Sequence, residues 1–178
     1  MKTGPKARRA TPLDKASLER LALRYAERYA TTRARLAAYL ARKLRERGWA
    51  GDAEPPVAAI VARMAALNYV DDRAFATARA AALGRRGLGE RRVVQDLRAA
   101  GIDEEDSAEA RAESRNQAWS AALRYAERRR IGPFAAVATD RPGREKALAA
   151  MLRAGHPLDL ARRLVSAAPG ETVEPIDT

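Results

Sequence analysis

A six-residue segment occurs twice in this chain with an identical sequence. Leu23-Arg-Tyr-Ala-Glu-Arg28 returns letter for letter as Leu123-Arg-Tyr-Ala-Glu-Arg128. Alanine and arginine are frequent here, but a six-residue identity that contains tyrosine indicates a copied unit rather than composition alone. Such repeats are typical of proteins in which each unit buries its apolar face against the next. The repeat therefore favours an extended binding surface over a deep catalytic pocket.

Three glycines indicate the length of the repeated unit. Gly48, Gly101 and Gly155 each follow a short segment that contains an apolar residue and a cation. A cation in the last turn and a glycine in the left-handed position are both signals that end a helix. The glycines lie 53 and 54 residues apart, a spacing that suits three helices per unit.

Apolar residues recur at three- and four-residue steps along the chain, which is the helical period. No segment shows the alternation and β-branched enrichment of a strand. The sequence therefore predicts an all-α protein built from three tandem three-helix repeats in an elongated, curved array. The predicted limits are a disordered basic arm over 1–15, helical repeats over 16–70, 71–115 and 116–168, and a flexible tail over 169–178.

The positive charge is concentrated in the N-terminal part of the chain. The net charge is +11, and residues 1–50 hold 14 Lys and Arg against 4 Asp and Glu. A basic half favours a polyanionic partner, either nucleic acid or a protein bound to it. A GC-rich genome also enriches arginine and alanine, so both explanations of the charge stay open.

Composition argues against several kinds of chemistry. The chain has no cysteine and a single histidine, His156, so disulfides, thiolate metal sites and the usual nucleophilic dyads are excluded. We interpret the acidic segments Asp71–Asp72 and Asp103–Asp106 as helix caps rather than metal ligands, and Gly84–Gly89 as a turn between helices. We expect no enzyme activity, no metal and no cofactor. Without a long apolar run or a signal core, a soluble cytoplasmic protein is expected.

Arginines are the strongest candidates for contacting a partner. Those of the repeated hexapeptide are spaced four residues apart in matching helices, and they form either plain solvated faces or a stepped basic strip. The full set of predicted partner-binding residues is Arg24, Arg28, Arg73, Arg79, Arg85, Arg86, Arg91, Arg92, Arg124 and Arg128.

Two segments in the middle of the chain carry a recognisable pattern: Tyr69–Ala76, with its Asp-Asp-Arg-Ala-Phe-Ala run, and Arg86–Asp103. Together they resemble the signature of the RecX family, although Ala100 stands where lysine is usual. The flanking repeats resemble the family in layout. Signature residues to which we assign structural roles are Asp71, Asp72, Phe75, Gly87, Gly89, Leu97 and Gly101.

The resemblance implies a bacterial regulator of the RecA recombinase that has no catalytic residue. Family members are tandem three-helix proteins that lodge in the groove of the RecA filament on single-stranded DNA. They inhibit ATP hydrolysis, filament growth and strand exchange, and so act in homologous recombination, DNA repair and the SOS response. We expect a monomer with RecA as its partner and single- or double-stranded DNA as a further one. The alternatives are a direct DNA-binding protein and a helical scaffold for another protein.

Overall fold

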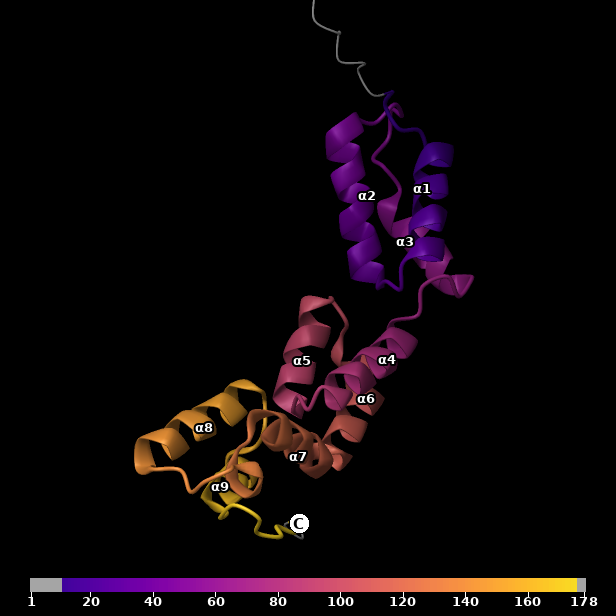
Figure 1. The fold of residues 1–178 in the computed structure, drawn as a ribbon. Helices are drawn as coiled ribbons and strands as arrows, with labels where there is room; N and C mark the ends of the chain where they lie inside the picture. Colours follow the sequence, from indigo (N-terminus) through magenta and orange to yellow (C-terminus); the bar gives the residue numbers. More distant parts are fainter. Residues whose placement is uncertain (1–10, 176–178) are drawn as a thin grey trace, which may run out of the picture. The chain divides into compact units, whose positions relative to one another are not determined.

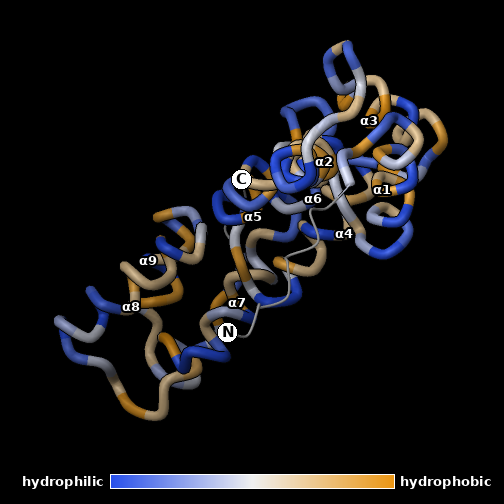
Figure 2. The backbone as a smooth tube through the Cα atoms, turned by 90° about the horizontal axis from the view of Figure 1, so that it is seen from above, coloured by the Kyte–Doolittle hydropathy of each residue, from blue (hydrophilic) through white to orange (hydrophobic). Residues whose placement is uncertain are grey.

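The computed structural model describes residues 11–175, and every regular element within them is a helix (Figure 1). Apolar and polar residues alternate along the helices in Figure 2, as amphipathic packing requires. The prediction of an all-α protein organised in three-helix repeats is confirmed. The helices are α1 (Lys15–Arg28), α2 (Arg33–Arg47), α3 (Val57–Ala66), α4 (Asp72–Arg85), α5 (Glu90–Ala99), α6 (Glu104–Asn116), α7 (Ala118–Arg129), the short 3₁₀ helix η1 (Gly132–Phe134), α8 (Arg141–Arg153) and α9 (Leu158–Ser166).

The chain divides after Asp71 into two compact units. Unit 1 holds α1 to α3, the first repeat, and buries a cluster of leucines with Ile60 and Met64. Its helix starts are defined by side-chain caps, because the Asp14 carboxylate accepts a bond from Ser17 N–H (2.8 Å). In the same way the Thr32 hydroxyl accepts from Arg35 N–H (3.2 Å) and starts α2.

The structure orders the end of the predicted basic arm, while residues 1–10 lie outside the described part. The Leu13 side chain is fully buried in the core of unit 1. Its N–H donates to Gly48 O (2.9 Å), and its carbonyl accepts from Ala50 N–H (2.9 Å), which forms a single bridge beside Trp49. Helix α1 then begins at Lys15, directly after its cap Asp14. The segment is ordered because Leu13 packs into the core of unit 1 and its backbone bonds to the end of α2.

Unit 2 holds the second and third repeats. In the second repeat α4, α5 and α6 enclose Leu83, Val93 and Leu97, and small alanines let α4 and α6 pack closely. In the third repeat α7, α8 and α9 enclose a separate core around Met151 and Leu164. Each core is small, which suits a sequence rich in alanine and poor in large apolar residues.

Part of the predicted tail packs against the third repeat. Gly170 N–H donates to Pro133 O (2.9 Å), and Val173 contacts the core that α7, α8 and α9 enclose. Residues 169–173 therefore extend the third repeat beyond the last helix, and residues 176–178 lie outside the described part. A short polar segment with one valine gave no sequence signal for this contact.

The three helix-ending glycines have the positive φ that was predicted. The φ angle is 81° at Gly48, 75° at Gly101 and 93° at Gly155. At Gly48 the ψ angle is 171°, so this residue lies outside the left-handed helical region that the pattern predicted. The spacing of these glycines indicated the three-helix unit correctly because each one follows the second helix of its repeat.

The two repeats of unit 2 join through a backbone contact between two turns. Gly89 N–H donates to Ala154 O (2.9 Å), and Arg91 N–H donates to Gly155 O (3.3 Å). A Cβ atom at Gly89 would lie 2.4 Å from the Gly155 carbonyl oxygen, and one at Gly155 would lie 2.5 Å from Arg92 N. Only residues without a side chain permit this approach. Gly89 of the family signature therefore acts by joining one repeat to the next.

His156 completes the same contact. Its side chain is fully buried, its Nε2 lies 3.1 Å from Gly87 O, and its ring packs on Tyr125. A carbonyl oxygen only accepts, so Nε2 carries the proton, and Nδ1 has no partner in the described structure. Burial lowers the pKa of His156 below its ordinary value, because the apolar surroundings disfavour the imidazolium.

We predict that Gly89→Ala lowers the free energy of unfolding of unit 2 by roughly 1–3 kcal/mol, because the new Cβ overlaps backbone that cannot move aside. Gly84→Ala is the matched control, since a Cβ at Gly84 meets nothing closer than 4.0 Å. Gly84 lies inside α4, so this control should stabilise by about 0.5–1 kcal/mol. Urea unfolding of both variants tests the contact, and equal stability of the two would contradict it.

We predict that acid weakens the contact through His156. Its folded pKa is lowered, so the unfolded chain binds the proton more readily, and stability falls as the pH drops through about 6.5, the ordinary pKa of imidazole. Melting temperatures at pH 7.5 and 5.5 should differ more in the natural chain than in His156→Gln, which cannot titrate. The same pH dependence in both proteins would assign the effect to other groups.

Candidate functional site

Within residues 11–175 no group of three or more His, Asp or Glu side chains is placed to hold a metal ion. Across the same residues, no helix has the length and apolar character to span a bilayer. Both units carry hollows on their surfaces.

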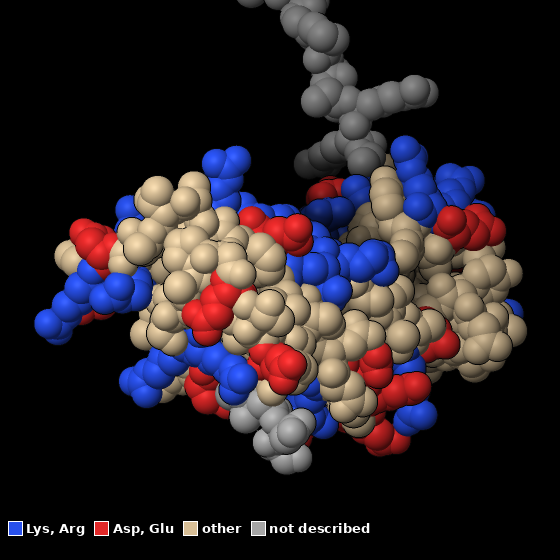
Figure 3. All heavy atoms as spheres, turned by 60° about the horizontal axis from the view of Figure 1, so that its bottom comes forward, with Lys and Arg blue, Asp and Glu red and all other residues tan. Residues whose placement is uncertain are grey.

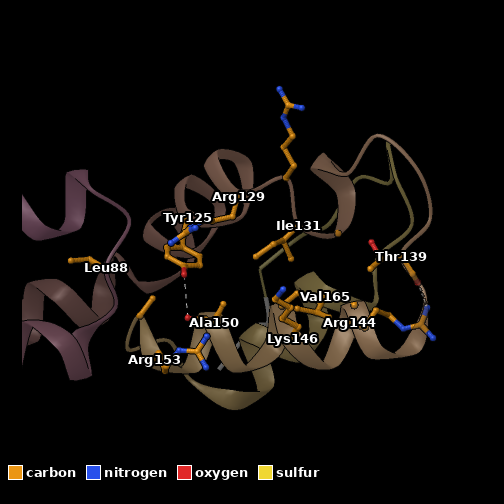
Figure 4. A pocket seen from close by; sticks show the side chains of 15 residues that line it. Leu88, Tyr125, Arg129, Ile131, Thr139, Arg144, Lys146, Ala150, Arg153 and Val165 are labelled. Carbon is orange, nitrogen blue, oxygen red and sulfur yellow. Dashed lines mark hydrogen bonds between the residues drawn. The ribbon is translucent and has the colours of Figure 1, made fainter.

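Unit 2 carries a cleft of about 590 Å³ in the third repeat (Figure 4). Its floor is apolar and comes from Leu88, Tyr125, Ile131, Ala150 and Val165, so that α7, α8, α9 and the turn before α5 all contribute. The Tyr125 hydroxyl donates to Ala150 O (3.2 Å), the bond dashed in Figure 4, and this ties α7 to α8. The cleft is therefore lined by helices that are bonded to each other.

The sides of the cleft are strongly basic. No aspartate or glutamate of the described chain lines it. On the face shown in Figure 3, acidic and basic side chains interleave, whereas the charged residues that line the cleft are all cations. In a partly apolar hollow the cations interact with an anion more strongly than they would on an open surface. The cations that line the cleft are Arg129, Arg130, Arg144, Lys146 and Arg153.

A second, adjoining hollow of about 460 Å³ shares Leu88, Tyr125 and Arg129 with the first and adds Arg86 and Arg128. We call the two hollows together the basic cleft. The Arg129 guanidinium lies 5.8 Å from the centre of the Tyr125 ring, where it makes a cation–π contact. The basic cleft therefore spans the contact between the second and third repeats and offers cations around an apolar floor.

The structure brings two of the predicted arginines, Arg86 and Arg128, into the basic cleft. Arg124 instead donates from Nε to Gly84 O (3.2 Å), so it links α7 to α4. Arg24 and Arg28 line a hollow of unit 1. The predicted residues that lie exposed outside both hollows are Arg85, Arg91 and Arg92.

Two predicted binding arginines have structural partners. Arg79 forms two bonds to the Asp96 carboxylate (2.6 and 2.9 Å) and joins α4 to α5. Arg73 bonds to Asp106 (2.9 Å) and Glu105 (3.0 Å) and joins α4 to α6. The hydrogen bond to Asp96 or Asp106, with the negative charge behind it, raises the pKa of each arginine. Both arginines therefore hold the second repeat together.

The signature residues of the middle repeat are mostly structural. Leu97 lies in the core, Phe75 packs against it, and Asp72 is buried at the first position of α4, just after the exposed Asp71. The glycines Gly87 and Gly101 have φ angles of 69° and 75°, which allow the turns that follow α4 and α5. Neither the aspartates nor the glycines lie in the basic cleft.

Most residues of the basic cleft were not predicted from the sequence. One available signal was the run Arg128–Arg130, which ends α7 with Arg130 at φ 53°, a position that glycine or asparagine usually takes. The other was the seven-residue step from Lys146 to Arg153, which places both cations on one face of α8 among alanines. Neither pattern stands out in a chain so rich in arginine.

These features define a class: an all-helical protein of three-helix repeats, of which the second and third join through glycine turns, with basic hollows in both units. A family model described as "RecX, second three-helix domain" matches residues 71–110. The regulatory protein RecX of Myxococcus xanthus (strain DK1622) is 31% identical over 174 residues, which cover 93% of this chain and 92% of that protein. This chain belongs to the RecX family.

Solved structures show the same fold. The crystal structure of RecX from Lactobacillus salivarius matches with a TM-score of 0.61 at 17% identity, covering 84% of this chain and 93% of that one. A second crystal structure of regulatory protein RecX matches with a TM-score of 0.58 at 20% identity, covering 86% of this chain and 78% of that one. The three-helix architecture is thus retained at low sequence identity.

We predict that Arg79→Ala lowers the free energy of unfolding by about 1 kcal/mol, because a bidentate ion pair at a half-exposed position is lost. Arg85→Ala on the same helix is the control, since Arg85 is exposed and no ion pair or hydrogen bond of its side chain occurs within residues 11–175. It should change stability by less than about 0.5 kcal/mol. Urea unfolding measures both, and an equal effect would mean that the Asp96 pair contributes nothing.

Proposed function

We propose that this protein regulates the RecA recombinase without catalysis, by binding in the groove of the RecA filament on single-stranded DNA. Binding there inhibits ATP hydrolysis, filament growth and strand exchange, and so modulates homologous recombination, DNA repair and the SOS response. The protein acts as a monomer in the cytoplasm. Membership of the RecX family is the observation that carries this proposal. The match to the regulatory protein RecX of Myxococcus xanthus covers 93% of this chain and 92% of that protein.

The basic cleft supports the proposal because it offers a physical means of binding. It combines cations with an apolar floor, an arrangement that suits an acidic protein segment with an apolar anchor. A filament presents the same surface again on each protomer. Repeats that are linked in one chain gain affinity there through effective concentration, even if each binds weakly.

A coupled ATPase assay on RecA and single-stranded DNA tests the proposal directly. We predict that the chain inhibits ATP hydrolysis when it is added at or below the concentration of RecA. Unchanged hydrolysis at a stoichiometric amount would contradict the proposed function. Labelled DNA without RecA, titrated in parallel, separates inhibition through the filament from simple competition for DNA.

We further predict that Lys146→Glu with Arg153→Glu raises the concentration for half-inhibition at least tenfold, because the cleft then repels an acidic partner. No bond of either side chain to other described residues would be lost. The control is Arg162→Glu with Arg163→Glu, which makes the same change of charge on exposed positions of α9. Equal weakening by both pairs would assign the effect to net charge and not to the cleft.

A further inference from the structure

Three tyrosine rings form a row on one side of unit 1. The rings of Tyr25 and Tyr39 stack across α1 and α2 with their centres 4.1 Å apart and their planes 16° from parallel. Tyr29, the residue that caps the C-terminus of α1, tilts against Tyr25 with the ring centres 5.2 Å apart. Tyr25 and Tyr39 rest partly on the core, whereas the Tyr29 residue is 49% exposed. The row therefore begins at the core and ends in a ring that is open to solvent.

Cations surround the row. The tyrosines line a hollow of about 430 Å³ together with Arg24, Arg28, Arg42 and Lys43, and no carboxylate of the described chain lines it. The Arg28 guanidinium lies 5.5 Å from the centre of the Tyr29 ring. Arg42 and Lys43 lie 5.5 and 5.9 Å from the centre of the Tyr39 ring. Each ring at the ends of the row thus has a cation beside its face.

The hollow keeps a positive net charge when the neighbouring carboxylate of Glu46 is counted with its four cations. Glu46 pairs with Lys43 (2.6 Å) and with Arg42 (3.6 Å), so one carboxylate serves both of these cations. Arg24 and Arg28 have no carboxylate within 4 Å anywhere in residues 11–175. These two side chains are available to an anionic ligand.

Comparison with the second copy of the hexapeptide shows that the row is not simply part of the core. Tyr125, the counterpart of Tyr25, is buried and donates its hydroxyl to Ala150 O. The hydroxyls of Tyr25, Tyr29 and Tyr39 make no hydrogen bond to other described residues. Identical local sequence is therefore used for packing in the third repeat and for an aromatic surface in the first.

We propose that this hollow binds single-stranded nucleic acid, with a base stacked on the exposed end of the row at Tyr29 and backbone phosphates paired with Arg24 and Arg28. Aromatic rings beside cations are what unpaired bases and their phosphates recognise. A cationic ligand is repelled by the four basic side chains. An acidic peptide would pair with the cations but has no base to stack on the Tyr29 ring. A duplex keeps its bases stacked inside the helix, so they do not reach that ring either. The site lies in unit 1 and does not depend on the proposed inhibition of RecA.

Fluorescence anisotropy of a labelled oligothymidine of about 20 nucleotides, added to the full chain without RecA, tests the site. Tyr29→Ala should weaken binding about tenfold, because stacking contributes roughly 1–3 kcal/mol per base. Tyr29→Phe should bind as the natural chain does, since the ring is kept. The Tyr29 ring is half exposed, so the fold should survive both changes, and circular dichroism and melting temperature verify this.

The cations are tested through salt dependence. Arg24→Ala with Arg28→Ala should reduce the slope of log affinity against log salt by about 1.4, because two phosphate contacts of a single strand are lost. Arg162→Ala with Arg163→Ala, which removes the same charge from α9, should leave the slope nearly unchanged. Polyglutamate and a duplex of equal length are the competitors, and both should displace the single strand poorly.

Several results would overturn the site. They are no binding of the oligonucleotide, equal binding by Tyr29→Ala and the natural chain, equal slopes for the two arginine pairs, and efficient displacement by polyglutamate. The last would assign the hollow to acidic protein. None of these outcomes bears on the RecA assay, so a chain that inhibits RecA but fails here loses this site and keeps its proposed function.

Discussion

The basic cleft depends on the close contact between two turns of unit 2, because this contact brings its two hollows together. Gly89 lies against Gly155 with no side chain between them, and the backbone bond from Gly89 N–H to Ala154 O fixes their register. This contact places Leu88 over the third repeat, where it forms part of the floor of the basic cleft. Arg86 is brought beside Arg128 by the same docking. A bulkier turn would separate the repeats and divide the cleft.

The architecture could be predicted from sequence because its signals are local. Gly48, Gly101 and Gly155 end helices within a few residues of the pattern that identifies them, and their spacing gives the three-helix unit. The resemblance of the middle repeat to the RecX signature is likewise carried by a short stretch, and a family model matches that stretch. The ordered segment around Leu13 was missed because its partner, the end of α2, lies more than 30 residues away in the sequence.

The candidate binding surface could be predicted only in part. The sequence does not distinguish an arginine that pairs with a carboxylate of the same chain from one that has no such partner. Arg79 has its partner Asp96 on the next helix, and Arg73 has Asp106 two helices away, so neither pairing follows from spacing along one helix. Lys146 and Arg153 line the same cleft as Tyr125 only because the long loop through η1 returns α8 beside α7. The repeated hexapeptide gives the clearest case, since its tyrosine is buried in one copy and part of an open aromatic row in the other.

Amide hydrogen exchange of the chain, free and bound to RecA on single-stranded DNA, tests most directly the claim that the basic cleft is the surface that meets the filament. The account predicts that binding slows exchange most in residues 125–131 and 143–154, which line the cleft. Slowing that is confined to the acidic first turn of α6, with the cleft segments unchanged, would contradict it.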